Sequence, residues 1–573
     1  MASSGGSSAG AESTAPRPRA STLGTPGLRP GLRWLQATAL LAGLVLVACL
    51  AGRLHGLMIE DDAFIFVRYA NNLLQHGSIS WNPGGPPTYG TTSLLYLVPV
   101  SGVQAVWGAS PARVAVLSSL LCGLAFLVLA VSRVRRATGA ASPGRRTLFV
   151  LFLLLPVAWS AESFGAHFVT GMDTMFALLA AAVLILAAIA FEERSSRGRG
   201  VVLCAAAGTA FFARPDLALY AGSLVLALGL WPLRGASRGR AAWIVVASLI
   251  VMGIGLACAW AYFGHPLPLS YFVKSAVRYG GDLEAEYAAV PGHQLGLYAA
   301  SYGLWLVPIG ARLVRDARQR RWSFSPVETA LLAGTAVFVL YYRFFVLQVM
   351  PHYQRFYYPT LPALVYLAAR SAVEWANHPW SARWRRFGGL GAPGRTAAIV
   401  RGAVCLALLA PAIPPVRSAV TRIRTQPFFY GQNAMDNHKG SGHRYWFRLE
   451  EFAALPVDLV LATTEIGLPG VLFRGNKVVD LSGLNDPRFA RHGFDADVFF
   501  GTDRPDLVYM PAADYRIMTQ RILEHPSFRA EYEYYPNQAV RTSLGIALRR
   551  TSVHYSAMRD IVFARAARQP RRP

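Results

Sequence analysis

Charged residues are scarce in this chain. They make up 15% of its 573 residues, whereas about a quarter of the residues of a typical soluble domain are charged. Hydrophobic residues make up 53%, and the mean hydropathy is +0.32. This composition excludes a disordered protein, a collagen-like protein, a disulfide-stapled secreted module and a series of soluble domains.

Lysine and cysteine are also rare. The 56 basic residues include only the lysines Lys274, Lys439 and Lys477, so arginine carries almost all of the net charge of +25. This skew is typical of a GC-rich genome, and we expect no nucleic-acid partner. The five cysteines lie in apolar runs without a CxxC motif, which predicts neither a disulfide framework nor a zinc site. We therefore predict no metal ligands, although the sequence leaves room for a divalent cation as cofactor.

Long apolar runs dominate the sequence instead. They cover about 34–52, 92–108, 113–132, 147–160, 173–191, 201–213, 217–231, 242–263, 295–311, 327–347, 357–373 and 397–414. Most have the length of a membrane-spanning helix. A span at 92–108 would put the arginine-rich loop 133–146 outside, against the positive-inside rule. This run, broken by Pro99 and Gly102, is therefore predicted to lie along the outer interface.

The remaining runs predict an α-helical polytopic membrane protein with about 11 transmembrane helices. Its basic clusters then fall on the cytoplasmic side: 17–33, 133–146, 194–199, 234–240, 312–321 and 383–395. An odd number of spans places the C-terminal region outside. We expect a disordered cytoplasmic tail at 1–33, a transmembrane module at 34–416 with a catalytic outer loop at 53–112, and a soluble extracytoplasmic α/β domain at 417–573.

The C-terminal region has the patterns of a mixed α/β domain. Segments 458–463, 477–481 and 506–510 read as strands, because short runs rich in valine and leucine are bounded by polar residues. A helix is expected at 512–525, and the segments FRAEYEYY and SLGIALRR predict two further strands. We therefore expect a soluble mixed α/β domain here, on the outer side of the membrane where the number of spans places this region.

The first outer loop carries two adjacent carboxylates. Asp61 and Asp62 precede a helical pattern, and Asp61 shares a helix face with Arg68. One aspartate could cap the helix while the other pairs with Arg68. Alternatively, the pair supplies the base of an extracytoplasmic active site.

Motifs along most of the chain resemble a known family. They are DDAFIFVRYANNLLQHGSISWNPG, Gly90-x-Thr92-x-x-Leu95, TGMDTMF at 170–176, RPD at 214–216, YFGHPLPLSYFVK at 262–274, QRFYYPTLP at 354–362 and VVDLSGLND at 478–486. In this order they resemble the GT-C glycosyltransferases, which use polyprenyl-phosphate sugars. The closer resemblance is to the family of the mycobacterial terminal arabinofuranosyltransferase of arabinan. One departure is Tyr89, where that family usually has an acid.

The resemblance implies an active site on the outer side of a cell membrane. The catalytic candidates are Asp61 and Asp62, of which Asp61 matches the usual base. Lys274 is the leading candidate for binding the donor phosphate, because a lysine is unusual in this composition, although it could instead snorkel to the headgroups. The other donor-binding candidates are Arg355, His352, Tyr353, Arg68, Arg214 and His265. The acceptor-binding candidates are Asn82, Asp173, Glu465 and Asp486; Asp173 could equally cap a helix, and Asp486 could serve a turn.

The expected function is therefore a membrane glycosyltransferase. It would transfer a sugar, with arabinofuranose as one candidate, from a polyprenyl-phosphate donor to a cell-envelope glycan, glycolipid or protein. Two other classes remain open: a transporter or flippase of lipid-linked sugars, and a non-catalytic envelope assembly protein. Paired broken helices would favour a transporter, and the sequence has none.

Overall fold

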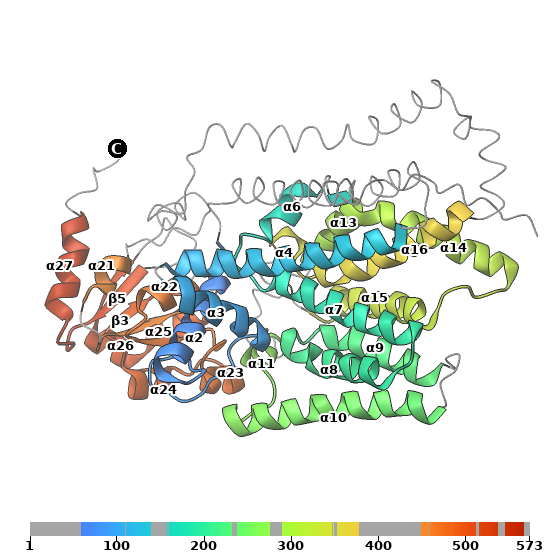
Figure 1. Ribbon diagram of the computed structural model, residues 1–573. Helices are drawn as coiled ribbons and strands as arrows, with labels where there is room; N and C mark the ends of the chain where they lie inside the picture. Colours follow the sequence, from blue (N-terminus) through green and yellow to red (C-terminus); the bar gives the residue numbers. More distant parts are fainter. Residues whose placement is uncertain are drawn as a thin grey trace, which may run out of the picture.

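A computed structural model describes the chain over residues 59–108, 110–138, 156–157, 160–231, 238–275, 289–346, 348, 352–377, 449–455, 458–511, 515–536 and 545–566. The expected tail at 1–33, the first span at 34–52 and the last span at 397–414 lie outside these residues, as does most of the run at 147–160. Within them the chain forms a helical part and a smaller C-terminal domain that contains a sheet (Figure 1).

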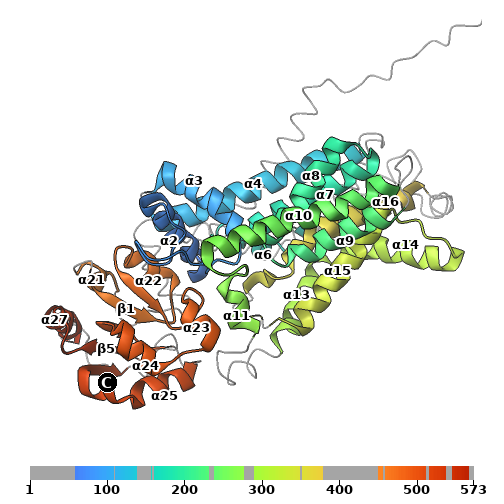
Figure 2. The ribbon, with the colours of Figure 1, turned by 90° about the horizontal axis from the view of Figure 1, so that it is seen from below.

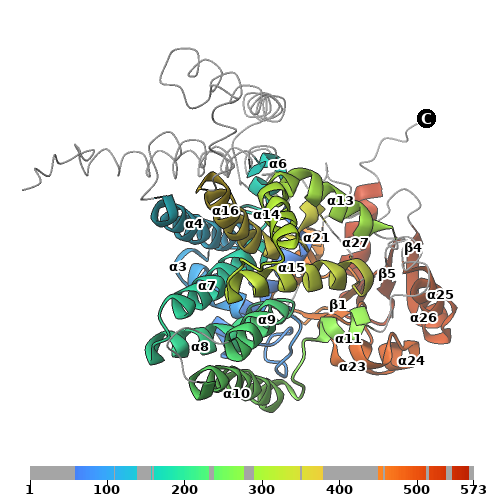
Figure 3. The ribbon, with the colours of Figure 1, turned by 90° about the vertical axis from the view of Figure 1, so that its right-hand side faces the viewer.

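The helical part is a bundle of apolar helices that lie side by side (Figures 1 and 3). Its long helices are α4 (Pro111–Thr138), α7 (Thr174–Glu193), α8 (Arg197–Ala213), α9 (Leu217–Leu230), α10 (Arg238–Phe263), α13 (Val290–Tyr302), α14 (Leu306–Gln319), α15 (Pro326–Phe344) and α16 (Leu361–Asn377). Short elements between them are α6 (Ala161–Ala166), α11 (Leu269–Ser275), η2 (Gly303–Trp305), η3 (His352–Gln354) and η4 (Tyr358–Thr360). Helices thus cover the expected spans that fall within the described ranges.

Several of these helices fit a bilayer by length and composition. The described residues contain five that are long and apolar enough to cross a membrane: Pro111–Ala130, Thr174–Glu193, Ala242–Phe263, Val290–Gln319 and Pro326–Phe344. Helices α8 and α9 have 17 and 14 residues, short for a hydrocarbon core of about 30 Å. Arg214 and Asp216 lie between the last residue of α8 and the first residue of α9. Their charged side chains are therefore at one end of the bundle.

The predicted loop at 53–112, called the first outer loop after its expected side, forms helices but no span over its described residues. Helix α2 (Asp61–His76) starts at the two aspartates, and Gly77 ends it in the left-handed conformation with φ of 68°. The run at 92–108 becomes η1 (Leu94–Tyr96) and α3 (Leu97–Trp107), an 11-residue helix that is too short to cross a bilayer. Helices α2 and α3 pack on each other between the bundle and the C-terminal domain (Figures 1 and 2).

The C-terminal domain contains a five-stranded mixed sheet in the order β2-β1-β3-β5-β4. Its strands are β1 (Val460–Thr463), β2 (Lys477–Asp480), β3 (Leu507–Tyr509), β4 (Tyr532–Pro536) and β5 (Gly545–Arg549). Strands β2, β1 and β3 are parallel, and β5 and β4 are antiparallel to their neighbours. All five strands predicted from the sequence are confirmed, and α25 (Arg516–Glu524) occupies the segment where a helix was expected.

Alternate residues of these strands face opposite sides of the sheet. Leu461 and Leu507 belong to the apolar core that continues into α2 and the bundle. Ala462 and Val508 face a separate core on the other side. The remaining helices of the domain are α21 (Leu449–Ala453), α22 (Gly467–Leu472), α23 (Pro487–His492), α24 (Ala496–Val498), η7 (Phe499–Asp503), α26 (Pro526–Glu531) and α27 (Tyr555–Ala566). The sheet is therefore one side of a core shared with the first outer loop.

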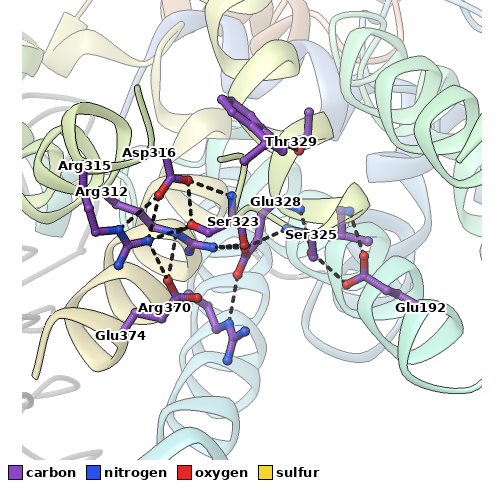
Figure 4. A network of polar contacts seen from close by, with 12 residues as sticks. Glu192, Arg312, Arg315, Asp316, Ser323, Ser325, Glu328, Thr329, Arg370 and Glu374 are labelled. Atoms are coloured by element: carbon purple, nitrogen blue, oxygen red, sulfur yellow. Dashed lines mark hydrogen bonds and ion pairs between the residues drawn. The ribbon is translucent and has the colours of Figure 1, made fainter. Parts of the chain in front are cut away.

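A buried network of charges joins α7, α14, α15 and α16 (Figure 4). Arg312 and Glu328 pair at 2.9 Å with side chains only 1% exposed, and Arg370 binds the second oxygen of Glu328 at 2.9 Å. Ser325 and Glu328 form a capping box at the start of α15, and Glu192 of α7 accepts a hydrogen bond from Ser325. Buried charges are tolerated only when they are paired in this way. The network therefore fixes how these four helices pack.

Candidate active site

A cavity of about 530 Å³ opens where the bundle meets the first outer loop and the C-terminal domain. Three acids and three cations line it: Asp62, Asp173, Asp216, Arg214, Lys274 and Arg355. The wall also includes Gly90, Thr91 and Thr92 of the G-x-T segment and Leu484 of the C-terminal domain. These residues come from segments spread over most of the chain. The cavity thus brings together five of the predicted site residues.

Asp62 and Arg355 pair across the cavity, with Asp62 Oδ2 and Arg355 Nη2 3.4 Å apart. The Asp62 side chain is 28% exposed, whereas that of Arg355 is 8% exposed. The Nε and Nη1 groups of Arg355 are buried and have no hydrogen-bond partner among the described residues. Two residues with left-handed backbone, Tyr353 (φ 54°) and Gln354 (φ 59°), precede Arg355. Such strained backbone commonly marks a functional segment.

Lys274 lies on α11 at the same cavity. Burial lowers the pKa of its ammonium group, while the negative charge of Asp62 acts in the opposite direction and the positive charge of Arg355 adds to the decrease. Within the described residues Lys274 forms no hydrogen bond and no ion pair, unlike Lys477, which pairs with Asp503 at 3.0 Å. Its charge is therefore available to an anion in the cavity, and this placement argues against a lysine that only reaches for headgroups.

A second group of charges lies at the end of α8 and the start of α9. Arg214 Nε is 3.1 Å from Asp216 Oδ2, and the hydroxyl of Tyr342 donates to the same oxygen at 2.6 Å. Both charged residues are more than nine-tenths buried. Asp216 precedes α9 as its N-cap residue, yet its side chain makes no capping hydrogen bond. The Arg-Pro-Asp motif therefore builds part of the cavity wall.

Asp61 does not line the cavity. Its two carboxylate oxygens accept hydrogen bonds from the backbone N–H groups of Gly467 at 2.8 Å and Leu468 at 2.7 Å, at the start of α22. A side chain on Gly467 would overlap the backbone and carboxylate of Asp61, so only glycine allows this approach. The structure thus gives the two neighbouring aspartates different surroundings, and only Asp62 faces the cavity.

Arg68 and Asn82 are also absent from the cavity lining. Arg68 is 1% exposed and donates to the backbone carbonyls of Trp81 (2.7 Å), Gly470, Phe473 (3.0 Å) and Asn476 (3.0 Å). It does not pair with Asp61, contrary to one alternative raised by the sequence; its Nη2 donates instead to Asn82 Oδ1 at 3.1 Å. Asn82 Oδ1 accepts a second hydrogen bond from the backbone of Val478 at 2.8 Å. Both residues attach the C-terminal domain to the first outer loop.

Among the other predicted residues, His265, Tyr353, Glu465 and Asp486 do not line the cavity. His265 Nδ1 is 2.6 Å from the carbonyl of Leu267, and burial lowers the pKa of the ring. Tyr353 contacts His167 through its ring and its carbonyl, and nothing is described of the side chain of His352. Glu465 follows β1, and Asp486 caps α23 and pairs with Arg488 at 2.6 Å. The structure therefore supports the turn and capping alternative for Asp486.

Some residues in and near the cavity were not among the predicted site residues. Asp216 lines the cavity two residues after Arg214, and Tyr342 gave no signal because it lies inside an apolar run. Ser93, next to the G-x-T segment, donates a hydrogen bond to Asp173. Tyr89, the departure from the family pattern, is fully buried and stacks on Phe263 at 4.8 Å. The sequence cues were the place of Asp216 in the RPD motif and that of Ser93 beside the G-x-T segment.

Metal ligands were not predicted, and no group of three or more His, Cys, Asp or Glu side chains in the described part of the chain could hold a metal ion. Each cavity carboxylate is instead engaged by a cation or a hydroxyl.

No protein-family model and no curated protein matches this chain. Among solved structures, it is similar to ArnT from Cupriavidus metallidurans. ArnT bound to undecaprenyl phosphate is 16% identical with a TM-score of 0.49, and apo ArnT is 17% identical with a TM-score of 0.48. Each match covers 89% of this chain and 98% of the other. At this identity and with TM-scores below 0.5, the similarity does not determine the function of this chain. The functional assignment therefore depends on the residues of this chain's own cavity.

Proposed function

We propose that this chain is a membrane glycosyltransferase of the GT-C type. It transfers a sugar from a polyprenyl-phosphate donor to a cell-envelope glycan, glycolipid or protein on the outer side of the membrane. The observation that supports this proposal most directly is the cavity in which Asp62 lies beside Lys274 and Arg355, next to the apolar helices. One carboxylate and two cations are what transfer from a sugar phosphate requires.

The cations suit a phosphate. Lys274 has no partner among the described residues, and Arg355 has two buried N–H groups without an acceptor. Buried donors of this kind normally have a partner, so an anion at this position would complete the site. Lysine offers a compact charge and arginine a planar fork, and both bind phosphate.

The cavity also has an apolar opening for a lipid chain. Tyr271 of α11 is 51% exposed and Phe345, just after α15, is 80% exposed, and both line the cavity. Exposed aromatic side chains beside membrane-spanning helices favour contact with lipid. A polyprenyl chain can therefore remain in the membrane while its phosphate reaches Lys274.

The side chains of the cavity supply the groups that a single-displacement transfer needs. The acceptor hydroxyl oxygen attacks the anomeric carbon, the bond between that carbon and the phosphate oxygen breaks, and the hydroxyl proton passes to Asp62. Polyprenyl phosphate leaves with its charge balanced by Lys274 and Arg355. The leaving phosphate needs no proton near neutral pH, so a second carboxylic acid is unnecessary, unlike in glycoside hydrolysis. The anomeric configuration is inverted.

Arabinofuranose is the donor sugar to test first, because the ordered motifs resemble the arabinofuranosyltransferase family. Full-length protein in nanodiscs would be incubated with short-chain polyprenyl-phosphate arabinofuranose and an arabinofuranoside acceptor, with mannosyl and glucosyl donors in parallel. Mass spectrometry would detect the product and NMR its anomeric configuration. We expect transfer with inversion from the arabinofuranosyl donor.

One outcome would change the donor sugar, and another would contradict the proposal. Transfer from another donor alone would retain the glycosyltransferase and reject the sugar. Absence of transfer from every donor, together with movement of the lipid-linked sugar across proteoliposome membranes, would identify a flippase instead.

A further inference from the structure

Asp173 is placed where an aspartate usually caps a helix, but it does not act as a cap. It is the N-cap residue of α7, and its side chain accepts no hydrogen bond from the first turn. Instead its Oδ2 accepts a hydrogen bond from the hydroxyl of Ser93, which directly follows the G-x-T segment. Asp173 is 7% exposed and lines the cavity. The carboxylate is thus held by a residue far away in sequence and turned toward the cavity.

The other oxygen of Asp173 is available to a ligand. Oδ1 has no hydrogen-bond partner among the described residues, and it is not one of the buried atoms that lack a partner, so it reaches the cavity surface. An ionised carboxylate only accepts hydrogen bonds. The complementary group is therefore a hydrogen-bond donor. A metal ion is a poor fit, since the described residues place no three metal-binding side chains together.

The position of Asp173 indicates which donor it meets. Asp173 is close enough to Lys274 and Arg214 to interact electrostatically with both. A sugar that is bonded to a phosphate at Lys274 cannot lie more than a few bonds from that phosphate. Its ring hydroxyls therefore come within reach of Asp173, whereas the acceptor approaches from the side of Asp62.

We propose that Asp173, positioned by Ser93, binds a hydroxyl group of the donor sugar and so contributes to sugar specificity. This inference rests on the proposed function, because it assumes a phosphate-linked sugar in the cavity. A hydrogen bond between a buried carboxylate and a substrate hydroxyl makes removal of either partner costly. Asp173 then contacts the substrate, and Ser93 acts through Asp173.

A double-mutant cycle, in which one change is made in the protein and the other in the donor sugar, tests this contact. Wild type and Asp173→Ala would be assayed with polyprenyl-phosphate arabinofuranose and with its 2-deoxy, 3-deoxy and 5-deoxy forms. We expect wild type to lose roughly 10- to 100-fold in kcat/KM on one deoxy donor, and Asp173→Ala to lose as much on the parent donor. On that deoxy donor the variant should match wild type, since the contact is already gone.

Ser93 provides the positioning control. Ser93→Ala should raise KM for the parent donor and leave that deoxy donor unaffected, whereas Ser93→Thr keeps the hydroxyl and should restore most of the loss. Equal losses by Asp173→Ala on every donor would overturn the inference, because they are expected of a structural residue or a base. No transfer by wild type from any of the tested donors would instead reject the proposed function. Thermal unfolding of each variant in detergent would separate loss of contact from loss of fold.

Discussion

At the scale of single residues, the two adjacent aspartates of the first outer loop separate into two environments. Successive residues of a helix point about 100° apart, so Asp61 faces α22 while Asp62 faces the cavity. We predict that Asp62→Asn lowers the transfer rate by about 10²–10⁴-fold and leaves thermal stability unchanged, since the amide cannot accept a proton. Asp61→Asn should lower the unfolding temperature, because one of its two acceptor oxygens is lost.

Transfer assays and thermal unfolding of the two variants would be compared. Loss of turnover at normal stability in Asp61→Asn, with near-normal turnover in Asp62→Asn, would restore Asp61 as the base. The sequence favoured that assignment. It could not show that the carboxylate of Asp61 accepts a hydrogen bond from the start of a helix 406 residues further along the chain.

The second residue-scale prediction concerns Lys274. Lys274→Ala should lower both donor affinity and turnover. The ammonium group of Lys274 would interact with the phosphate charge in the bound donor and again in the transition state. Lys274→Arg should restore part of the rate. Lys477→Ala is the matched control, since Lys477 pairs with Asp503 on the C-terminal domain. Initial rates over a range of donor concentrations measure both effects; equal rates for Lys274→Ala and the control would remove Lys274 from the phosphate site.

At the scale of elements, the short helix α22 meets α2 through a contact that tolerates no side chain. Gly467→Ala should push α22 away from Asp61 and lower the free energy of unfolding by about 1–3 kcal/mol, with loss of transfer as the cavity wall at Leu484 shifts. Gly501→Ala is the control, because a side chain there meets no atom within 4 Å. Thermal unfolding and limited proteolysis would compare the two; equal stability would show that this contact does not hold the domain.

Most helices and strands could be predicted from the sequence, but the contacts between them could not. Apolar runs and alternating strands depend on local periodicity, which is why α7, α15 and all five strands were predicted. The run at 92–108 required the arginine distribution as well. Arg68 is attached to the C-terminal domain by backbone carbonyls of distant residues, and Asn82 by the backbone N–H of Val478. Backbone groups are present in every residue, so the choice of amino acid does not reveal these contacts.

At the scale of the whole molecule, the orientation of the chain remains a prediction from arginine placement. In a variant that lacks the native cysteines, a cysteine at Val553, which is 86% exposed on the C-terminal domain, should react with an impermeant maleimide in intact cells. A cysteine at the exposed Ser132, in the last part of α4, should react only after lysis. Labelling of the Ser132 position in intact cells would reverse the topology and move the cavity to the cytoplasm.

The hydrogen bonds of Arg68 have a consequence for how the protein is made. Three of the four backbone carbonyls that accept hydrogen bonds from its guanidinium lie 402 to 408 residues further along the chain. A ribosome therefore completes the helical part before Arg68 can acquire these three partners. In the finished protein, burial lowers the pKa of Arg68 to about 9. The attachment of the first outer loop to the C-terminal domain is thus among the last features to form, and a chain released early would lack it.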